Sequence, residues 1–371
     1  MDNDELSNGL LPWDESVTGN EIAEATCKLV KKHLVTESHT PEAMTLWVML
    51  TYCFTAFRCL PKLAIISPEK RCGKSTALEI IQGLAHKELT ASNVTSAVLY
   101  RSIEIWKPTL IIDEVDTFLT TNEELRGIIN SGHTKGTAYV LRCTGQSHEP
   151  QQFSTFTPMC MAGIGTKSIP DTIQDRSIMV ELRRKKLDDI VTRLPVDFKD
   201  ECLDIRRKIK RWGDDNFDKL KNHYPENIPS IANDRMEDNW IPLLTIADCI
   251  SDSWSHKARE AMLSLNQLRD DDDSASIELL KDIRILWQST DGDRMYSEKL
   301  VDKLVKLEDR PWCEWKRGHP MTQNSLARLL KPFKIKSKDL RIGTLKPRKG
   351  YERKSFNDSF TRYLKADSNT Q

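Results

Sequence analysis

The segment SPEKRCGKST, residues 67–76, constrains the fold of this chain more than any other. Its second half, Gly73-Lys74-Ser75-Thr76, ends as a phosphate-binding P-loop does, but Pro68 stands where the G-x-x-x-x-G-K-[ST] pattern has its first glycine. Proline fixes φ near about −65°, so it cannot replace a glycine of positive φ. A short apolar run, KLAIIS, precedes the segment, and STALEIIQGLA follows with helical spacing. The order strand, loop, helix predicts a P-loop with a proline entrance; the alternative is a chance GKS on a surface turn.

The predicted loop assigns particular roles to its last residues. Backbone N–H groups of such a loop wrap phosphates, a lysine reaches the β- and γ-phosphates, and a hydroxyl holds Mg²⁺. We therefore expect ATP and Mg²⁺ as cofactors, with Lys74 on the phosphates and Ser75 on the metal. The expected nucleotide contacts are Pro68, Glu69, Lys70, Arg71, Cys72, Gly73, Lys74, Ser75 and Thr76. Lys70 and Arg71 have no individual role.

A second acidic element follows four apolar residues in TLIIDEVDTF. At the end of a buried strand, Asp113 would hold Mg²⁺ through water, and Glu114 would orient and polarise the attacking water. The alternative is an acidic turn that only ends the strand. The P-loop at suitable spacing favours the catalytic interpretation, whereas Asp116 is better explained as a helix cap.

An arginine precedes the last predicted strand of the sheet in IPDTIQDRSIMVEL. In oligomeric ATPases of the AAA+ type, an arginine at this place reaches the γ-phosphate of the neighbouring subunit and stabilises transition-state charge. Arg176 is therefore a candidate catalytic residue acting between subunits. The alternative is a local ion pair with Asp171 or Asp175.

Two weaker nucleotide contacts complete the predicted site. Thr166 follows the third buried strand, PMCMAGIG, where a polar residue often senses the γ-phosphate. Arg235 lies in a helical region and is a candidate lid arginine over the nucleotide. Its alternative is a pair with Glu237 or Asp238.

The pattern of elements predicts an α/β fold. Strands alternating with helices imply a mostly parallel sheet, here a P-loop NTPase core of the AAA+ kind, followed by a helical lid and a small α+β domain. The predicted divisions are a disordered lead 1–20, helices 21–60, the ATPase core 61–186, the lid region 187–268, an acidic linker 269–276 and the C-terminal domain 277–371.

Positive charge is concentrated near the C-terminus although the formal net charge is zero. Residues 331–354 carry ten Lys or Arg against two acids, which is typical equally of a nucleic-acid contact and of a solvated basic face. A hairpin around Thr144-Gly145-Gln146 would offer another contact; an ordinary extension of the sheet is the alternative. The candidate nucleic-acid contacts are His133, Lys135, Arg142, Lys346, Arg348 and Lys349.

Cysteine usage and the absence of apolar spans predict a cytoplasmic chain. The nine cysteines are scattered, with no C-x-x-C and no histidine at zinc spacing, which is typical of buried thiols in a reducing compartment. The acidic N-terminus does not resemble a signal peptide, and no apolar run reaches membrane length. We expect no metal site other than Mg²⁺ and no membrane partner.

Five ordered motifs between about residues 40 and 365 resemble the family called domain of unknown function 3631. They include the P-loop segment, PTLIIDEVDTF, NEELRGIINSGHTKGTAYVLRC, MAGIGTKSIPDTIQDRSIMVELRRK and DRMEDNWIPLLTIADCISDSWSHKAR. The resemblance implies a P-loop ATPase of phages, plasmids or integrated elements, in which S-P-E before G-K-[ST] is usual, so that Pro68 is expected. It also implies that PWCEWKRGHPMTQNSLARLLKPFKIKSKDLRI belongs to a module similar to a winged helix.

The leading hypothesis is a Mg²⁺-dependent ATPase, helicase-like or replication-associated, of a mobile genetic element. We expect a homo-oligomer that acts on nucleic acid, DNA in the first place, and a primase or other replication protein as a further partner. Helicase work is an inference by analogy. One alternative is a nucleotide-gated assembly protein that binds DNA or a partner without unwinding. A small-molecule kinase is disfavoured because no acceptor site is evident.

Overall fold

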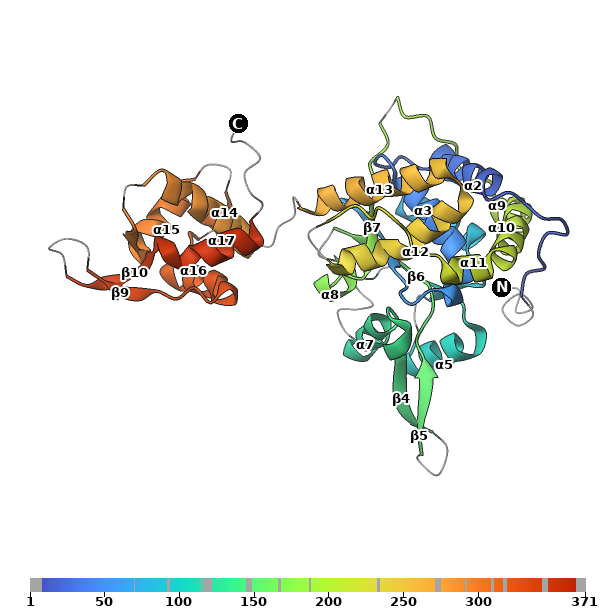
Figure 1. The fold of residues 1–371 in the computed structure, drawn as a ribbon, viewed down its shortest axis with the longest axis horizontal. Coiled ribbons are helices and arrows are strands. Elements are labelled where there is room, and N and C mark those ends of the chain that lie inside the picture. The colour runs from blue at the N-terminus through green and yellow to red at the C-terminus, as the bar shows by residue number, and fades with distance from the viewer. Residues whose placement is uncertain are drawn as a thin grey trace. The chain divides into compact units, whose positions relative to one another are not determined.

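The computed structural model describes residues 9–69, 71–91, 94–113, 115, 122–144, 149–165, 168–186, 188–231, 234–270, 275–290, 292–307, 310–315, 319–341 and 346–364. The chain divides into two compact units, Met1–Leu268 and Arg269–Gln371, each of which is described by itself (Figure 1). No helix in the described residues is both long and apolar enough to cross a membrane.

A parallel sheet forms the centre of the first unit. Its strands are β1 (Lys62–Ser67), β2 (Glu88–Ala91), β3 (Thr109–Ile112), β6 (Met159–Ile164) and β7 (Ser177–Glu181), in the order β2-β3-β6-β1-β7. Every neighbouring pair runs parallel. The predicted α/β class with a parallel sheet is therefore confirmed. The edge strand β2 was not predicted from the sequence.

Helices cover both faces of this sheet, because successive residues of a strand point to opposite sides. Leu63 and Ile65 of β1 belong to one hydrophobic cluster, and Ala64 and Ile66 belong to the other. The first cluster includes residues of α2 (Gly19–His33), α3 (Thr40–Cys53), α4 (Lys74–Leu84), α9 (Phe198–Glu201), α10 (Leu203–Asp215), α11 (Phe217–Asn222), α12 (Asp234–Ile250) and α13 (Asp252–Asp270). The second includes residues of α5 (Ser96–Trp106), α7 (Glu123–Ser131) and α8 (Asp171–Gln174).

Helix α3 lies at the centre of the larger cluster. The sequence predicts a helix that begins near Thr40, has proline in its first turn and is apolar nearly all round, and all fourteen residues of α3 are buried. The helices expected as a lid region, 187–268, contribute to the same core as α3 and β1. They therefore form one compact unit with the sheet.

The N-terminal segment corrects one expectation. Residues 12–14, expected to belong to a disordered lead, contact α10. The N–H of Trp13 donates to the carbonyl of Arg207 at 3.0 Å, and the charged groups of Arg207 and Lys208 lie over the Trp13 ring at 5.0 and 4.7 Å. Such cation–π contacts order the segment, and nothing apart from the single indole signals this in the sequence.

A separate hairpin extends from the first unit. Strands β4 (Tyr139–Thr144) and β5 (Glu149–Ser154) pair antiparallel, which confirms the predicted hairpin, although residues 145–148 lie outside the described part. Helix α7 contacts β4 and helix α5 contacts β5, and the two strands reach beyond both helices (Figure 1). A 3₁₀ turn, η2 (Lys135–Thr137), precedes β4, and another, η1 (Phe54–Ala56), follows α3.

The second unit is a small α+β structure. Its main elements are α14 (Ala275–Gln288), β8 (Arg294–Tyr296), α15 (Ser297–Val305), α16 (Gln323–Leu330), β9 (Lys338–Leu340), β10 (Arg348–Glu352) and α17 (Asn357–Tyr363). The 3₁₀ turns are η4 (Pro311–Glu314), η5 (Lys331–Phe333) and η6 (Arg353–Phe356). Strand β10 pairs antiparallel with both β8 and β9. Trp287, Trp312 and Phe356 are almost fully buried in its core.

Candidate functional site

The connections that follow β1 and β6 leave the sheet in opposite directions. After β1 the chain passes through α4 to β2, beyond β6 and β3, whereas after β6 it passes through α8 to β7, on the other side of β1. Adjacent strands with diverging connections mark the crevice where open α/β sheets bind ligands, at the carboxyl ends of the strands. The segment 68–73 begins at this place.

The described part of the predicted P-loop has the backbone of a tight turn into a helix. Arg71 and Gly73 have φ of 69° and 85°, in the left-handed region. Gly73 is the N-cap of α4, and its carbonyl accepts from the N–H of Ala77 at 2.9 Å. Because glycine has no side chain, the cap residue of α4 cannot accept hydrogen bonds from the first N–H groups of the helix through a side chain. Lys70 lies outside the described residues.

The other side chains of this segment differ in how far they are exposed to solvent. Cys72 is buried in the larger hydrophobic cluster, so its thiol does not face solvent. Glu69 pairs with Arg184 at 2.9 Å, and both side chains are exposed. Ser75 is exposed at the start of α4, whereas Thr76 is half-buried. Cys72 can therefore offer a ligand its backbone but not its thiol, whereas the Ser75 hydroxyl is accessible.

Lys74 and Asp113 meet at the carboxyl edge of the sheet. The Nζ of Lys74 lies 2.7 Å from Oδ1 of Asp113, although the residues are 39 positions apart. The side chain of Lys74 is 17% exposed and that of Asp113 is 38% exposed. The structure thus brings together the two residues that the sequence assigns to phosphate and to Mg²⁺. Glu114 and Thr166, predicted for the same edge, lie outside the described residues.

Two glycines, Gly163 in β6 and Gly165 just after it, fix the backbone at the carboxyl edge of the sheet. A Cβ on Gly163 would lie 2.2 Å from Oγ of Ser168, so no larger residue fits there without displacing that hydroxyl. Gly165 has φ of 74°, and its N–H donates to the carbonyl of Ser67 at 2.8 Å. The chain that leaves β6 is therefore fixed against the last residue of β1.

Arg176 lies at the other edge of the sheet. Its carbonyl accepts from the N–H of Lys62, the first residue of β1, at 2.9 Å. Six residues of β1 separate this edge from the P-loop, a distance of about 20 Å. The Arg176 guanidinium donates to the carbonyl of Thr172. Within one chain, Arg176 and Lys74 therefore do not share a site.

Arg235 corrects the expectation of a lid contact in the same chain. It lies on α12, with Nη1 3.5 Å from Oδ2 of Asp175, rather than paired with Glu237 or Asp238. Burial lowers the pKa of the Arg176 guanidinium, and the charge of Arg235 lowers it further. Helix α12 packs against α3 and β7, and this packing holds Arg235 at the edge opposite Lys74.

A cavity of about 410 Å³ joins the two arginines. Its lining residues are Asn130, Ser131, His133, Thr134, Thr137, Arg176, Arg235 and Asp238. Most of this lining is polar, and it comes from α7, the segment after it, the residue before β7 and α12. The sequence indicates separate roles for His133, Arg176 and Arg235, but nothing in it indicates that they line one cavity.

His133 corrects a second expectation, because it does not face solvent as a nucleic-acid contact would. It is 6% exposed, and its Nε2 lies 2.8 Å from Oδ1 of Asn239 on α12. Burial lowers the pKa of His133 to about 4, with a further contribution from the charge of Lys62, so the imidazole is neutral at pH 7. Of the other two candidates, Lys135 donates to the carbonyl of Thr55 at 2.9 Å, and Arg142, on β4, pairs with Glu124 at 2.5 Å.

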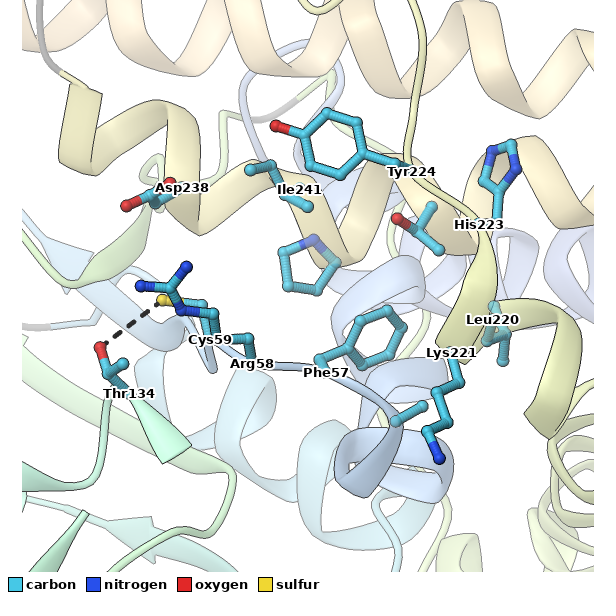
Figure 2. A pocket seen from close by; sticks show the side chains of 13 residues that line it. Phe57, Arg58, Cys59, Thr134, Leu220, Lys221, His223, Tyr224, Asp238 and Ile241 are labelled. Atoms are coloured by element: carbon cyan, nitrogen blue, oxygen red, sulfur yellow. Dashed lines mark hydrogen bonds between the residues drawn. The ribbon is translucent and has the colours of Figure 1, made fainter. Parts of the chain in front are cut away.

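A second cavity, of about 430 Å³, adjoins the first (Figure 2). Thr134 and Asp238 line both. Its other lining residues are Ala56, Phe57, Arg58, Cys59, Leu220, Lys221, His223, Tyr224, Ile241, Pro242 and Thr245. In Figure 2 the Arg58 side chain points toward α12, on which Asp238 and Ile241 lie.

Cys59 and His133 approach each other beside these cavities without the features of a reactive pair. The Cys59 Sγ lies 3.5 Å from Nδ1 and 3.6 Å from Nε2 of His133, and 3.9 Å from Oγ1 of Thr134. Burial raises the pKa of the Cys59 thiol, and the imidazole is a weak base. Thiolate chemistry is therefore disfavoured at this place.

The basic residues predicted near the C-terminus lie on and beside strand β10. Lys346 is exposed. Arg348 pairs with Glu298 at 3.4 Å, and Lys349 pairs with Asp339 at 3.0 Å, with all four side chains mostly exposed. Exposed pairs of this kind are weak, so the two cations remain available to a stronger anion.

Residues 181–363 match the model of a family described as Protein of unknown function (DUF3631). The match begins at the last residue of β7 and continues into α17, so it includes Arg235 and the basic residues of β10. The P-loop segment, Asp113 and Arg176 precede it.

One curated relative, described as an uncharacterized 28.9 kDa protein in the xis 5' region of Saccharopolyspora erythraea, is 32% identical over 133 residues. The alignment covers 35% of this chain and 49% of the relative, so the chain spans about half the length of that protein. Two apo structures of the C-terminal region of NrS-1 are also similar, with 13% and 15% identity and a TM-score of 0.44 for each. Each similarity covers 92% of this chain and 77% of the solved chain.

Proposed function

We propose that this chain is a Mg²⁺-dependent ATPase. The observation that carries the proposal is the contact between Lys74 and Asp113 at the carboxyl edge of the sheet, in the crevice where the connections after β1 and β6 diverge. A P-loop lysine and a strand-ending aspartate are the two charged groups that this chemistry requires. Their meeting across β6 makes a chance GKS on a surface turn the weaker explanation.

The residues of this crevice fit a nucleotide with its metal ion. The left-handed backbone of Arg71 and Gly73 turns the loop into α4, whose first N–H groups suit phosphate oxygens. Lys74 would exchange Asp113 for the β- and γ-phosphates. The Ser75 hydroxyl and the Asp113 carboxylate are oxygen ligands of the kind that Mg²⁺ prefers, and the ion would neutralise phosphate charge. Glu114 is proposed to orient the attacking water.

Arg176 is proposed to act on the nucleotide of a neighbouring subunit. It lies about 20 Å from the P-loop edge of its own sheet, so it cannot reach a nucleotide on its own P-loop, and a second copy would have to present one. This assignment makes a homo-oligomer the active form. A phosphoryl group flanked by Lys74 of one subunit and Arg176 of the next would receive positive charge from both sides.

Nucleic acid, DNA in the first place, is the proposed substrate of the motion that hydrolysis would drive. In the second unit, α14, β8, α15, α16, β9 and β10 follow one another in the order of a winged helix, with Lys346, Arg348 and Lys349 beside its last strand. The relative's place in a xis 5' region is in keeping with an integrated element. A replication-associated role in such an element, helicase-like or with a primase as partner, is part of the proposal.

The test is ATP turnover by the full chain with and without Mg²⁺, single-stranded DNA, duplex DNA and RNA, with the oligomeric state measured in parallel. We expect turnover that requires Mg²⁺, is lost in Lys74→Ala and rises with DNA. Absence of turnover under all these conditions would overturn the ATPase proposal. Turnover without strand separation would favour the nucleotide-gated binding protein, and transfer of phosphate to a metabolite would favour a kinase.

A further inference from the structure

A lysine is buried without a hydrogen-bond partner at the edge of the sheet that holds Arg176. Lys62 is 1% exposed, and its Nζ finds no partner among the described residues. A buried ammonium without a partner is costly, and an apolar residue at the start of β1 would avoid that cost. The proposed ATPase chemistry at Lys74 gives no reason for a lysine at position 62, which points to a role of Lys62 at its own edge of the sheet.

The charge of Lys62 acts on the cavity that Arg176 and Arg235 share. Lys62 is not one of the lining residues. His133 is one of them, and burial lowers the pKa of His133, with a further contribution from the charge of Lys62. Arg176 lines the cavity too, and its charge lowers the pKa of Lys62. The N–H of Lys62 also donates to the carbonyl of Arg176 at 2.9 Å, so this buried lysine is next to the cavity lining without being part of it.

The groups around Lys62 leave the cavity positive. Arg176 and Arg235 are the cations that line the cavity itself, and Arg58 and Lys221 line the adjoining cavity. Asp238 lines both cavities, and Asp175 pairs with Arg235. His133 and Cys59 are neutral, for the reasons given above. Among the described residues that line the cavity itself, two guanidinium groups thus face one carboxylate before Lys62 is counted.

We propose that Arg176 and Arg235 together bind the terminal phosphate of a nucleotide held by a second copy of this chain, with Lys62 supplying positive charge from beside the cavity lining. This inference rests on the proposed ATPase function. It adds Arg235 and Lys62 to Arg176, and it makes α12 part of the subunit contact. Two guanidinium groups suit a terminal phosphate because they offer several N–H donors to its oxygens.

The geometry favours a phosphate from another molecule. The chain's own P-loop lies at the opposite edge of the sheet, about 20 Å away. The Arg235 side chain is 49% exposed and lines the cavity, so its guanidinium is accessible to an anion that enters there. The polar neighbours Asn130, Ser131 and Thr137 offer further hydrogen bonds in the cavity.

Lys62 couples this binding to protonation. Burial, reinforced by the charge of Arg176, lowers the pKa of Lys62 to about 7. A phosphate in the cavity favours the charged lysine and raises that pKa again. Binding therefore takes up a proton above pH 7 and weakens as pH rises, whereas a chain with Met at position 62 lacks this dependence.

Subunit mixing tests the inference. Arg235→Ala and Lys62→Met each keep an intact P-loop, whereas Lys74→Ala keeps an intact cavity. We expect each variant alone to turn over ATP at least about tenfold more slowly than wild type, and mixtures of Arg235→Ala or Lys62→Met with Lys74→Ala to recover part of the rate. Mixing with the double variant Lys74→Ala/Arg235→Ala should recover nothing for Arg235→Ala. Exposed Arg193→Ala is the matched control and should hydrolyse ATP normally.

Two further readouts separate this role from a structural one. Arg235→Lys should keep part of the rate if charge is what matters, and the wild-type rate between pH 6.5 and 8.5, about the pKa of Lys62, should fall more steeply than that of Lys62→Met. Normal turnover in Arg235→Ala and Lys62→Met would overturn the inference while leaving the ATPase intact. Loss of single-stranded DNA binding with unchanged turnover would also overturn it, in favour of a backbone phosphate. Absence of wild-type turnover would overturn both proposals.

Discussion

The Nζ of Lys74 lies 2.7 Å from Oδ1 of Asp113, so an ion pair joins the start of α4 to the end of β3 across the strand between them. A partly exposed pair of this kind contributes little to stability, because water screens it. The Lys74–Asp113 pair matters here because, in the proposed nucleotide complex, a bound phosphate would take the place of Asp113 beside Lys74. The Asp113 carboxylate would then hold a cation beside that phosphate.

Asp113→Asn separates the two roles of this carboxylate. Because the pair is 17% and 38% exposed, we expect the unfolding free energy to change by less than about 1 kcal/mol. Turnover with Mg²⁺ should fall at least about 100-fold, the scale of removing one preorganised electrostatic contact. Asp215→Asn, which breaks an exposed pair with Arg211, is the control for loss of a carboxylate. Equal turnover in the two variants would contradict the role of Asp113.

Glu114→Gln tests the predicted general base, which lies outside the described residues. Removal of a positioned base typically costs about 10²- to 10⁴-fold in rate. We expect the variant to bind ATP with unchanged affinity and to lose turnover on this scale. Equilibrium binding of a fluorescent ATP analogue, measured beside single-turnover hydrolysis, distinguishes the two effects. A variant that binds weakly would instead assign Glu114 to the cofactor contacts.

The parts of the fold that could be predicted are those with a local pattern. The run KLAIIS became β1, TLII became β3, and the segment after Gly73 became α4, because burial on both faces gives a strand an unbroken apolar run. Strand β2 and helix α5 were missed. Three of the four residues of β2 are only partly buried, and the strand lies at the sheet edge, so its sequence has neither an unbroken apolar run nor a clear alternation.

The surroundings of single charged residues could not be predicted, because they depend on distant partners. His133 is buried by contact with Asn239, 106 positions away, and nothing near it in the sequence indicates this. Arg235 meets Asp175 because α12 packs beside β7. Lys62 starts an apolar strand, where a lysine would ordinarily mark the exposed end. Its burial follows from the elements that cover the edge of the sheet.

The basic residues of the second unit predict a salt-dependent contact with DNA. Each phosphate contact contributes about −0.9 to the slope of log K against log salt for duplex DNA. Replacement of Lys346, Arg348 and Lys349 by alanine should weaken binding. If one to three phosphate contacts are lost, the slope should become shallower by about 1 to 3. The exposed triple Lys185, Lys186 and Arg193 in the first unit is the matched control. Equal slopes would make the basic strand a solvated face.

Lys62→Met makes a separate prediction about stability, which does not depend on any ligand. The folded pKa of Lys62, about 7, lies below the ordinary 10.5 because burial penalises the charge. Between these values the unfolded chain holds a proton that the folded chain has released. The wild-type unfolding free energy should therefore rise with pH across this window, by at most about 1.4 kcal/mol per pH unit, and the penalty is complete below pH 7.

The variant removes both the penalty and the slope. We expect Lys62→Met to be more stable than wild type at pH 6 and 7, with an advantage that shrinks as pH rises toward 10.5. Denaturant unfolding at pH 6, 7, 8 and 9 measures the difference, which cancels the titration of all other groups that the two chains share. Lys185→Met, at an exposed position, should show no such trend. A constant difference between Lys62→Met and wild type would mean that Lys62 keeps its ordinary pKa, and its ammonium would then have found an anionic partner or water in solution.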